Sequence, residues 1–119
     1  MSASKTIRLG ETEIRMRASA LIPRLYRYKF GRDIVCDMRR LQDKLAAVKD
    51  SGAQLDAVDL TVFEDIAWLL CKHADPAVPN EPDEWLDSIP GVFDVYSIFP
   101  EIADLWGSNL RQTSVPAKK

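Results

Sequence analysis

Apolar and polar residues alternate near the start of the chain, between Thr6 and Arg17. The apolar positions are Ile7, Leu9, Ile14 and Met16, and the charged positions between them are Arg8, Glu13, Arg15 and Arg17. Such alternation is typical of half-buried β-strands, and Gly10-Glu11 supplies a turn between two of them. A sheet of two strands is only marginally stable by itself, so we expect helices to cover the apolar face of this hairpin.

The spacing of apolar residues becomes helical after Ser19. Ser19 is a candidate N-cap, Pro23 is tolerated in a first turn, and Gly31 is expected to end the helix. Asp33 is the expected N-cap of a second helix, which ends near Asp50-Ser51-Gly52. Its apolar stripe comprises Ile34, Met38, Leu41, Leu45 and Val48, and its opposite face carries Arg39, Arg40 and Lys44. This pattern predicts a two-faced surface helix.

Further helices are predicted in the second half of the chain. Thr61-Val62-Phe63-Glu64 matches the capping-box signature, and a buried stripe follows it: Phe63, Ile66, Ala67 and Leu70. The segment from Asp75 to Pro82 holds three of the seven prolines and is predicted to be an irregular linker. Asp83 is expected to begin a short helix. Val92 to Leu110 is expected to form another, kinked or interrupted near Pro100, with apolar residues at helical spacing: Tyr96, Phe99, Ile102, Ala103 and Trp106.

These elements predict an α+β fold that is mostly α, in which an N-terminal β-hairpin packs on a bundle of about four to five helices. The 119 residues suit one domain, with unanchored ends at Met1 to Ser4 and Gln112 to Lys119. No apolar stretch approaches the roughly twenty residues that span a bilayer, and no signal peptide is visible. We therefore expect a cytoplasmic protein, in which Cys36 and Cys71 are reduced and behave as small hydrophobic residues.

Charge is distributed unevenly along the chain. Residues 1–49 carry twelve Lys or Arg against five Asp or Glu, and residues 50–119 carry four against thirteen. The boundary lies between two predicted helices, so the two charges belong to different elements and are able to face opposite ways. We hypothesise that the basic half of one copy contacts the acidic half of the next, in a head-to-tail array.

Catalytic and metal-binding patterns are weak. His73 lies close to Cys71 and Asp75, but on a helix two residues two positions apart point in different directions, unlike the spacing of helical metal sites. His73 is better explained as a residue that meets the C-terminal dipole of a helix. Acidic residues follow the C-terminal helices without the spacing of a calcium loop: Asp83, Glu84, Asp87, Asp94, Glu101 and Asp104. We expect no enzyme activity, no cofactor and no metal site.

A basic run with interleaved aromatics, Arg24 to Arg32, precedes the Arg39-Arg40 pair. Helix, glycine turn and second helix suggest an alternative function, a DNA-binding regulator that uses Arg24 to Arg40. The acidic pI of 5.4 and the carboxylates of Asp33 and Asp37, where a recognition helix would meet bases, disfavour nucleic acid as a partner. If this segment does not bind nucleic acid, its basic residues form solvated helix faces and Tyr26 or Phe30 belongs to the core.

Five short segments occur in this order along the chain: Phe30-Gly31-Arg32-Asp33-Ile34, Asp83-Glu84-Trp85-Leu86-Asp87-Ser88, Ile98-Phe99-Pro100-Glu101-Ile102, Leu105-Trp106 and Lys118-Lys119. Together they resemble the tail assembly chaperones of siphophages and prophages, particularly those of Gram-positive bacteria. Their order, after a short hairpin and an aromatic helix, resembles the family over most of the chain. Lys118-Lys119 also suits an adenine-rich slippery site, which would give the longer frameshift product of many members.

The resemblance implies a non-enzymatic function in the host cytoplasm. A chaperone of this family binds and solubilises the tape-measure protein, recruits the major tail protein during tube assembly, and is absent from the mature virion. No membrane partner is implied. Trp85 and Trp106 either pack in the core or dock on a partner. The candidate partner-binding residues are Arg24, Arg27, Arg39, Arg40, Trp85, Asp87, Glu101 and Trp106.

Overall fold

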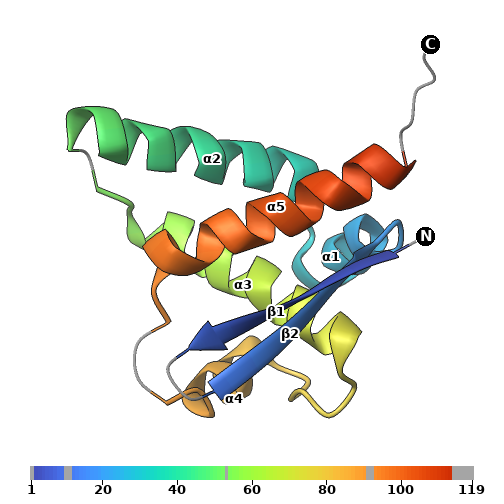
Figure 1. The fold of residues 1–119 in the computed structure, drawn as a ribbon. Coiled ribbons are helices and arrows are strands. Elements are labelled where there is room, and N and C mark those ends of the chain that lie inside the picture. Colours follow the sequence, from blue (N-terminus) through green and yellow to red (C-terminus); the bar gives the residue numbers. More distant parts are fainter. Residues whose placement is uncertain (1, 10–11, 53, 91–92, 114–119) are drawn as a thin grey trace.

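A computed structural model describes residues 2–9, 12–52, 54–90 and 93–113. It contains a two-stranded antiparallel sheet followed by helices (Figure 1), which confirms the α+β, mostly α class. The elements are β1 (Ser2–Leu9), β2 (Thr12–Ser19), α1 (Ile22–Phe30), α2 (Ile34–Ser51), α3 (Ala57–Ala74), α4 (Pro82–Asp87) and α5 (Val95–Thr113). No described helix is both long enough and apolar enough to cross a bilayer.

The hairpin is longer than the alternating pattern predicts. Its register runs from the pair Leu9 and Thr12 back to the pair Ser2 and Ser19. The prediction that residues 2–4 are unanchored is therefore wrong, because these residues are paired in the ladder. The predicted turn at residues 10–11 and the C-terminal residues 114–119 lie outside the described part of the chain.

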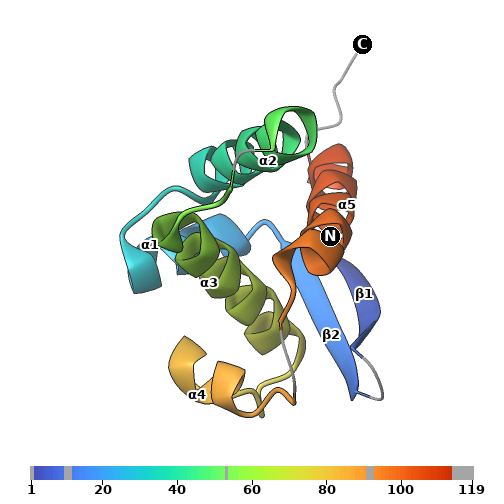
Figure 2. The same cartoon turned by 90° about the vertical axis from the view of Figure 1, so that its left-hand side faces the viewer.

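Helix α3 forms the centre of the core. It packs against β2, α1, α2, α4 and α5, and Figure 2 shows it surrounded by these elements. Most of its residues from Val62 to Cys71 are buried, including the predicted stripe of Phe63, Ile66, Ala67 and Leu70. α5 covers the inner face of the hairpin, so the expectation that helices cover this face is confirmed.

Glycines end α1 and α2 as the sequence predicts. Gly31 and Gly52 adopt left-handed conformations, with φ of 70° and 75°, and each donates its N–H to the carbonyl four residues earlier. Asp33 caps α2, since its side chain accepts a hydrogen bond from the Val35 N–H at 2.9 Å. The predicted cap of α1 is wrong. Ser19 ends β2, and the N-cap of α1 is Leu21.

The start of α3 was predicted too late in the chain. The helix begins at Ala57, and Asp56 and Asp59 form the capping box by exchanging backbone-to-carboxylate hydrogen bonds of 2.8 and 3.2 Å. Thr61 lies inside the helix, where its hydroxyl donates to the Ala57 carbonyl. Asp59 supplies the carboxylate of the third helical position in the observed capping box, as Glu64 does in the predicted one. The earlier start also brings residues 57–60 into the hydrogen-bonded helix.

The later elements follow the predictions more closely. Residues 75–81 form turns and bends without a helix or strand, and α4 begins at Pro82. Helix α5 begins at Val95 and continues through Pro100, so the proline does not interrupt it.

Candidate functional site

An open groove of about 410 Å³ lies between α2 and α5. Leu45, Val48 and Lys49 line it from α2, and Tyr96 and Pro100 line it from α5. The two helices separate toward the C-terminal end of α2 and the N-terminal end of α5, where these residues lie (Figure 1). Apart from Lys49, the lining is apolar or aromatic.

The α2 wall of the groove is formed where the apolar stripe of the helix leaves the core. The first part of the stripe, Ile34, Met38 and Leu41, is buried against neighbouring elements. Leu45 and Val48 continue the same stripe but are only half-buried. α2 is thus longer than the core that it covers, and its last two turns present aliphatic surface to solvent.

The α5 wall places two apolar residues outside the core. Ile98, Phe99 and Ile102 are buried, whereas Tyr96 is 53 % exposed and Pro100 is exposed. Pro100 has no N–H to donate to the carbonyl of Tyr96, four residues earlier, so this carbonyl loses its usual helical partner. The wall therefore combines apolar surface with a backbone acceptor.

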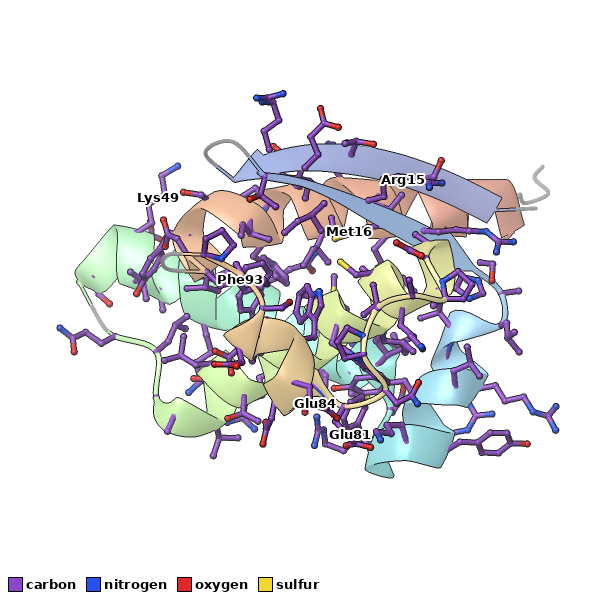
Figure 3. The ribbon with its side chains drawn as sticks, turned by 90° about the horizontal axis from the view of Figure 1, so that it is seen from below. Arg15, Met16, Lys49, Glu81, Glu84 and Phe93 are labelled. Atoms are coloured by element: carbon purple, nitrogen blue, oxygen red, sulfur yellow. The ribbon has the colours of Figure 1, made fainter. Side chains whose placement is uncertain are left out.

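This arrangement suits an apolar segment with a few polar groups. The exposed amine of Lys49 has no acidic partner among the described residues, and Figure 3 shows it near the end of α2. Lys49 is able to donate to a carboxylate of a bound segment, and the Tyr96 carbonyl is able to accept from a donor. Aliphatic and aromatic lining with few polar groups is typical of grooves that bind the apolar face of a helix.

A buried carboxylate holds α2 on α3 and so fixes one wall of the groove. Asp59 is completely buried, and its carboxylate accepts a hydrogen bond from Arg40 Nε at 3.1 Å and lies 3.3 Å from Lys44 Nζ. Burial alone would raise the pKa of Asp59, but the Asp56 N–H and the Lys44 ammonium outweigh it and lower this pKa below its ordinary value. Asp59 is thus a capping residue and also the anchor of an inter-helix ion pair.

A second network joins α1, α2 and α3 around Arg32. Its guanidinium donates to Asp65 at 2.8 Å, to Asp37 at 3.0 Å and to the Tyr26 hydroxyl at 3.0 Å, and the Tyr26 hydroxyl donates to Asp37 at 2.7 Å. Burial raises the pKa of Asp65, and the nearby Arg32 only partly offsets this effect. The four side chains satisfy one another's hydrogen-bonding groups in a partly buried part of the fold.

The opposite charges of the two halves pair within one molecule. Of nine ion pairs among the described residues, seven join a base from residues 1–49 to an acid from residues 50–119. These seven link Lys5 with Glu101 and Asp104, Lys29 with Glu81, Arg32 with Asp65, Arg40 with Asp59, and Lys44 with Asp56 and Asp59. The two halves are able to face opposite ways by sequence, but the elements that carry these residues face each other.

The predicted basic surface is divided by these contacts. Arg27 and Arg39 are exposed, Arg24 donates to the exposed hydroxyl of Tyr28 at 2.7 Å, and Arg40 is paired with the buried Asp59. Among the described residues, Arg40 is thus the one candidate arginine that pairs with an acid. The alternative of a DNA-binding regulator, which needs free cations facing phosphates, stays a prediction.

The predicted tryptophan sites lie inside the protein. Trp85 and Trp106 are each 5 % exposed, so their side chains pack in the core and offer little surface to a partner. Trp85 meets the ring of Phe93 edge-on at 5.3 Å, and Phe93, labelled in Figure 3, stacks on Phe63 at 5.2 Å. Each of these large aromatic side chains buries a large apolar area and so stabilises the core of a small domain.

The two acidic candidates have different surroundings. Asp87 is exposed at the end of α4. Glu101 lies 2.6 Å from Lys5 Nζ and so serves to hold α5 on β1. The structure does not bring these two residues together with the candidate arginines.

His73 pairs with a hydroxyl. Its Nε2 lies 2.9 Å from the Ser19 hydroxyl, and it occupies the last turn of α3, as the dipole explanation predicts. Partial burial, together with the charge of Arg17, lowers its pKa. Cys71 is buried, which raises its pKa to about 12, and Cys36 is exposed. Within the described ranges, no three His, Cys, Asp or Glu side chains are placed to hold a metal ion.

Glu64 is a partly buried acid whose carboxylate has, within the part of the chain that the structure describes, no nearby positive charge or hydrogen-bond donor that lowers its pKa. Burial raises its pKa, and the charges of Asp65 and Asp83 raise it further. An acid whose pKa is raised by folding destabilises the native state at neutral pH, and this effect disappears as the pH falls through the folded-state pKa. We expect Glu64→Gln to raise the free energy of unfolding at pH 7 by a few tenths of a kcal/mol to about 1 kcal/mol. Urea unfolding at pH 7 and pH 5 measures this.

The exposed Glu84 of α4 provides the control for that prediction. Glu84→Gln removes the same charge without removing a partly buried carboxylate, so we expect a smaller change. Equal stabilisation by the two variants would show that general charge repulsion, and not burial of Glu64, is responsible.

The sequence pattern places several groove residues on apolar faces but does not predict the groove. Leu45 and Val48 belong to the apolar stripe of the predicted surface helix, and Tyr96 belongs to the apolar positions of the last predicted helix. The length of the apolar stripe is the signal that could have indicated the groove. A stripe of five apolar residues is longer than a domain of this size is able to bury completely. Comparison of the chain with known protein families, curated proteins and solved structures finds no match.

Proposed function

We propose that this protein is a non-enzymatic chaperone of phage tail assembly, which binds apolar helical segments of a tape-measure protein in the groove between α2 and α5. The groove itself is the observation that carries the proposal. Leu45, Val48, Tyr96 and Pro100 form an apolar lining that the fold leaves open, although the rest of the apolar stripe of α2 is buried. An amphipathic helix is the kind of ligand that such a groove accommodates.

The tail-chaperone-like segment Ile98-Phe99-Pro100-Glu101-Ile102 connects the resemblance to the groove. Phe99 and Ile102 anchor α5 in the core, Glu101 pairs with Lys5, and Pro100 lines the groove. One short segment thus positions α5 and supplies part of the binding surface. This division of roles supports the resemblance.

Reversible binding is what such a chaperone requires. A groove of this size covers only part of a helix, so each contact is weak and many copies are needed along one tape-measure protein. Major tail protein subunits then displace the copies one at a time as the tube grows. This exchange takes place in the host cytoplasm, and the chaperone is left out of the virion.

The internal ion pairs change the expected mode of self-association. Five of the twelve bases in residues 1–49 and six of the thirteen acids in residues 50–119 already pair with each other within one molecule. Breaking these pairs to form new ones with a neighbour would bring little net gain. The proposal therefore does not include a head-to-tail array.

We expect Val48→Asp to weaken binding of a tape-measure fragment at least tenfold, because it places a carboxylate in the apolar lining. The measurement is co-expression and affinity purification with an apolar helical fragment of the tape-measure protein from the same phage genome, followed by titration calorimetry. Val35→Asp is the matched control, since Val35 is an exposed valine of the same helix outside the groove. We expect this variant to bind like the parent protein.

The outcomes separate the function from the site. If the parent protein does not bind the fragment, the proposed function is wrong. If Val48→Asp and Val35→Asp both bind like the parent, the function stands and the groove is the wrong surface. Salt-sensitive binding of duplex DNA without fragment binding would favour the regulator.

A further inference from the structure

The sheet has only two strands, so each strand has one edge without a paired neighbour. β2 lies against α3, whereas no described helix or strand lies beyond the outer edge of β1 (Figures 2 and 3). β1 is eight residues long and contains neither proline nor glycine. A long, regular edge of this kind is a template for pairing with another strand.

The register shows which peptide groups face the free edge. Leu9 and Thr12 flank a two-residue connection, so they form the hydrogen-bonded closing pair of the hairpin. Hydrogen-bonded and non-hydrogen-bonded pairs alternate along an antiparallel ladder. It follows that Ser4, Thr6 and Arg8 point their N–H and C=O groups away from β2.

We propose that β1 pairs antiparallel with β1 of a second copy, with Thr6 opposite the partner's Thr6, to form a continuous four-stranded sheet. In this register Ser4 lies opposite the partner's Arg8, and Lys5 lies opposite the partner's Ile7. Both members of each pair lie on the same face of the sheet, as antiparallel pairing requires. The three residues with outward-facing peptide groups are then the ones that form the new hydrogen bonds.

Charge and length together select this register. Of the two nearest registers that keep the faces aligned, one places Lys5 opposite the partner's Lys5, and like charges directly opposite each other are destabilising. The other places Ile7 on the two-fold axis and pairs only residues 5–9 of each strand, whereas the Thr6 register pairs residues 3–9. With Thr6 at the two-fold axis, no two charged side chains of β1 are opposite each other.

Lys5 is the feature that would ordinarily prevent edge pairing. An inward-pointing lysine on an edge strand blocks a neighbouring strand, because its charge would be buried. Here Lys5 Nζ lies 2.6 Å from Glu101 and 2.9 Å from Asp104 of α5. Its charge is already compensated on the side of the sheet to which it points, so it does not exclude a strand at the edge.

The contact is symmetric, so it closes as a dimer and does not extend into an array. It rests on backbone hydrogen bonds more than on charge, and added salt should therefore weaken it little. It does not depend on the proposed function, since neither the groove nor a tape-measure protein takes part.

Sedimentation equilibrium of the full chain over a range of concentrations tests the dimer. We expect the average mass to rise from 13.4 kDa toward twice that value. Thr6→Glu places two carboxylates opposite each other at the axis. It should raise the protein concentration at the midpoint of the monomer–dimer transition at least tenfold. Ser4→Glu adds the same charge to the same face of the same strand, but places it opposite the partner's Arg8, so it should shift the midpoint lower.

Opposite shifts by these two variants support the register, whereas equal shifts, or a parent protein that stays monomeric throughout, would overturn the proposal. Circular dichroism checks that both variants are folded. Cysteine cross-linking gives a second measurement in a Cys36→Ser background. Thr6→Cys should form a disulfide-linked dimer on mild oxidation, because opposite Cα atoms lie about 5.5 Å apart. Ser4→Cys should not, and cross-linking of both or neither would contradict the register.

Discussion

Replacing Arg40 and Lys44 together with methionine is expected to lower the free energy of unfolding by about 3–5 kcal/mol. The two side chains are partly exposed, but the carboxylate that they neutralise is not, since Asp59 is completely buried. Methionine keeps the aliphatic part of each side chain, so the loss comes from leaving a charge unpaired in the interior. Urea unfolding at pH 7 measures this change.

Arg39→Met is the control for this double variant, because Arg39 is an exposed arginine of the same helix. We expect it to change stability by less than about 0.5 kcal/mol. The pH dependence gives an independent check. In the parent protein the lowered pKa of Asp59 contributes stability that is present at neutral pH and is lost as the pH falls below its ordinary value of 3.8.

In the double variant burial of Asp59 is opposed only by the Asp56 N–H, so the pKa of Asp59 should be higher than in the parent protein and the variant should lose less stability as the pH falls. The deficit relative to the parent protein therefore narrows in acid. A deficit that is the same at pH 7 and pH 4 would show that the effect comes from lost packing and not from the unpaired carboxylate.

Replacing Arg32 with methionine is expected to cost about 3 kcal/mol or more. Asp37 and Asp65 have side chains that are only 17 % and 11 % exposed, and Arg32 is their shared counter-ion. Without it the two carboxylates keep only the Tyr26 hydroxyl, which donates to Asp37. We expect thermal unfolding to show a lower Tm together with a reduced deficit in acid, because the pKa of Asp65 is already raised and would rise further.

Arg27→Met is the matched control on the neighbouring helix α1, since Arg27 is exposed. Arg32→Lys is a more specific comparison. Lysine keeps the charge but cannot donate to Asp37, Asp65 and Tyr26 from one planar group, so it should recover only part of the stability. Full recovery by lysine would show that charge alone matters and that the geometry of the network does not.

The sequence predicts the elements of this fold better than it predicts their ends. Alternation identifies the hairpin, and Asp33, Gly31 and Gly52 mark the helix ends around α1 and α2 because their conformations are dictated locally. Local signals compete at α3, where Asp56 and Thr61 both begin a valid capping-box pattern. Tertiary pairing of Asp59 with α2 favours the earlier start, and no local pattern contains that information.

The site is less predictable for a related physical reason. Helical periodicity shows that Leu45 and Val48 share a face with Ile34, but not that they lie at the margin of the core and stay half-buried. Charge counting likewise shows an excess of bases in one half, but not that Arg40 and Lys44 meet Asp59. Both facts depend on distances between segments far apart in the chain, which a one-dimensional pattern does not contain.

The pairing of Lys5 with Glu101 and Asp104 makes the first and last described elements partners in folding. β1 precedes α5 in the order of synthesis, so the part of the hairpin that α5 covers waits until all of the residues between them have been made. A two-stranded hairpin is marginal until a helix covers it, and contacts between distant segments slow folding. A nascent chain therefore exposes the apolar face of β1 until α5 has been made, and crowded polysomes are where this face is most exposed to contact with the wrong neighbour.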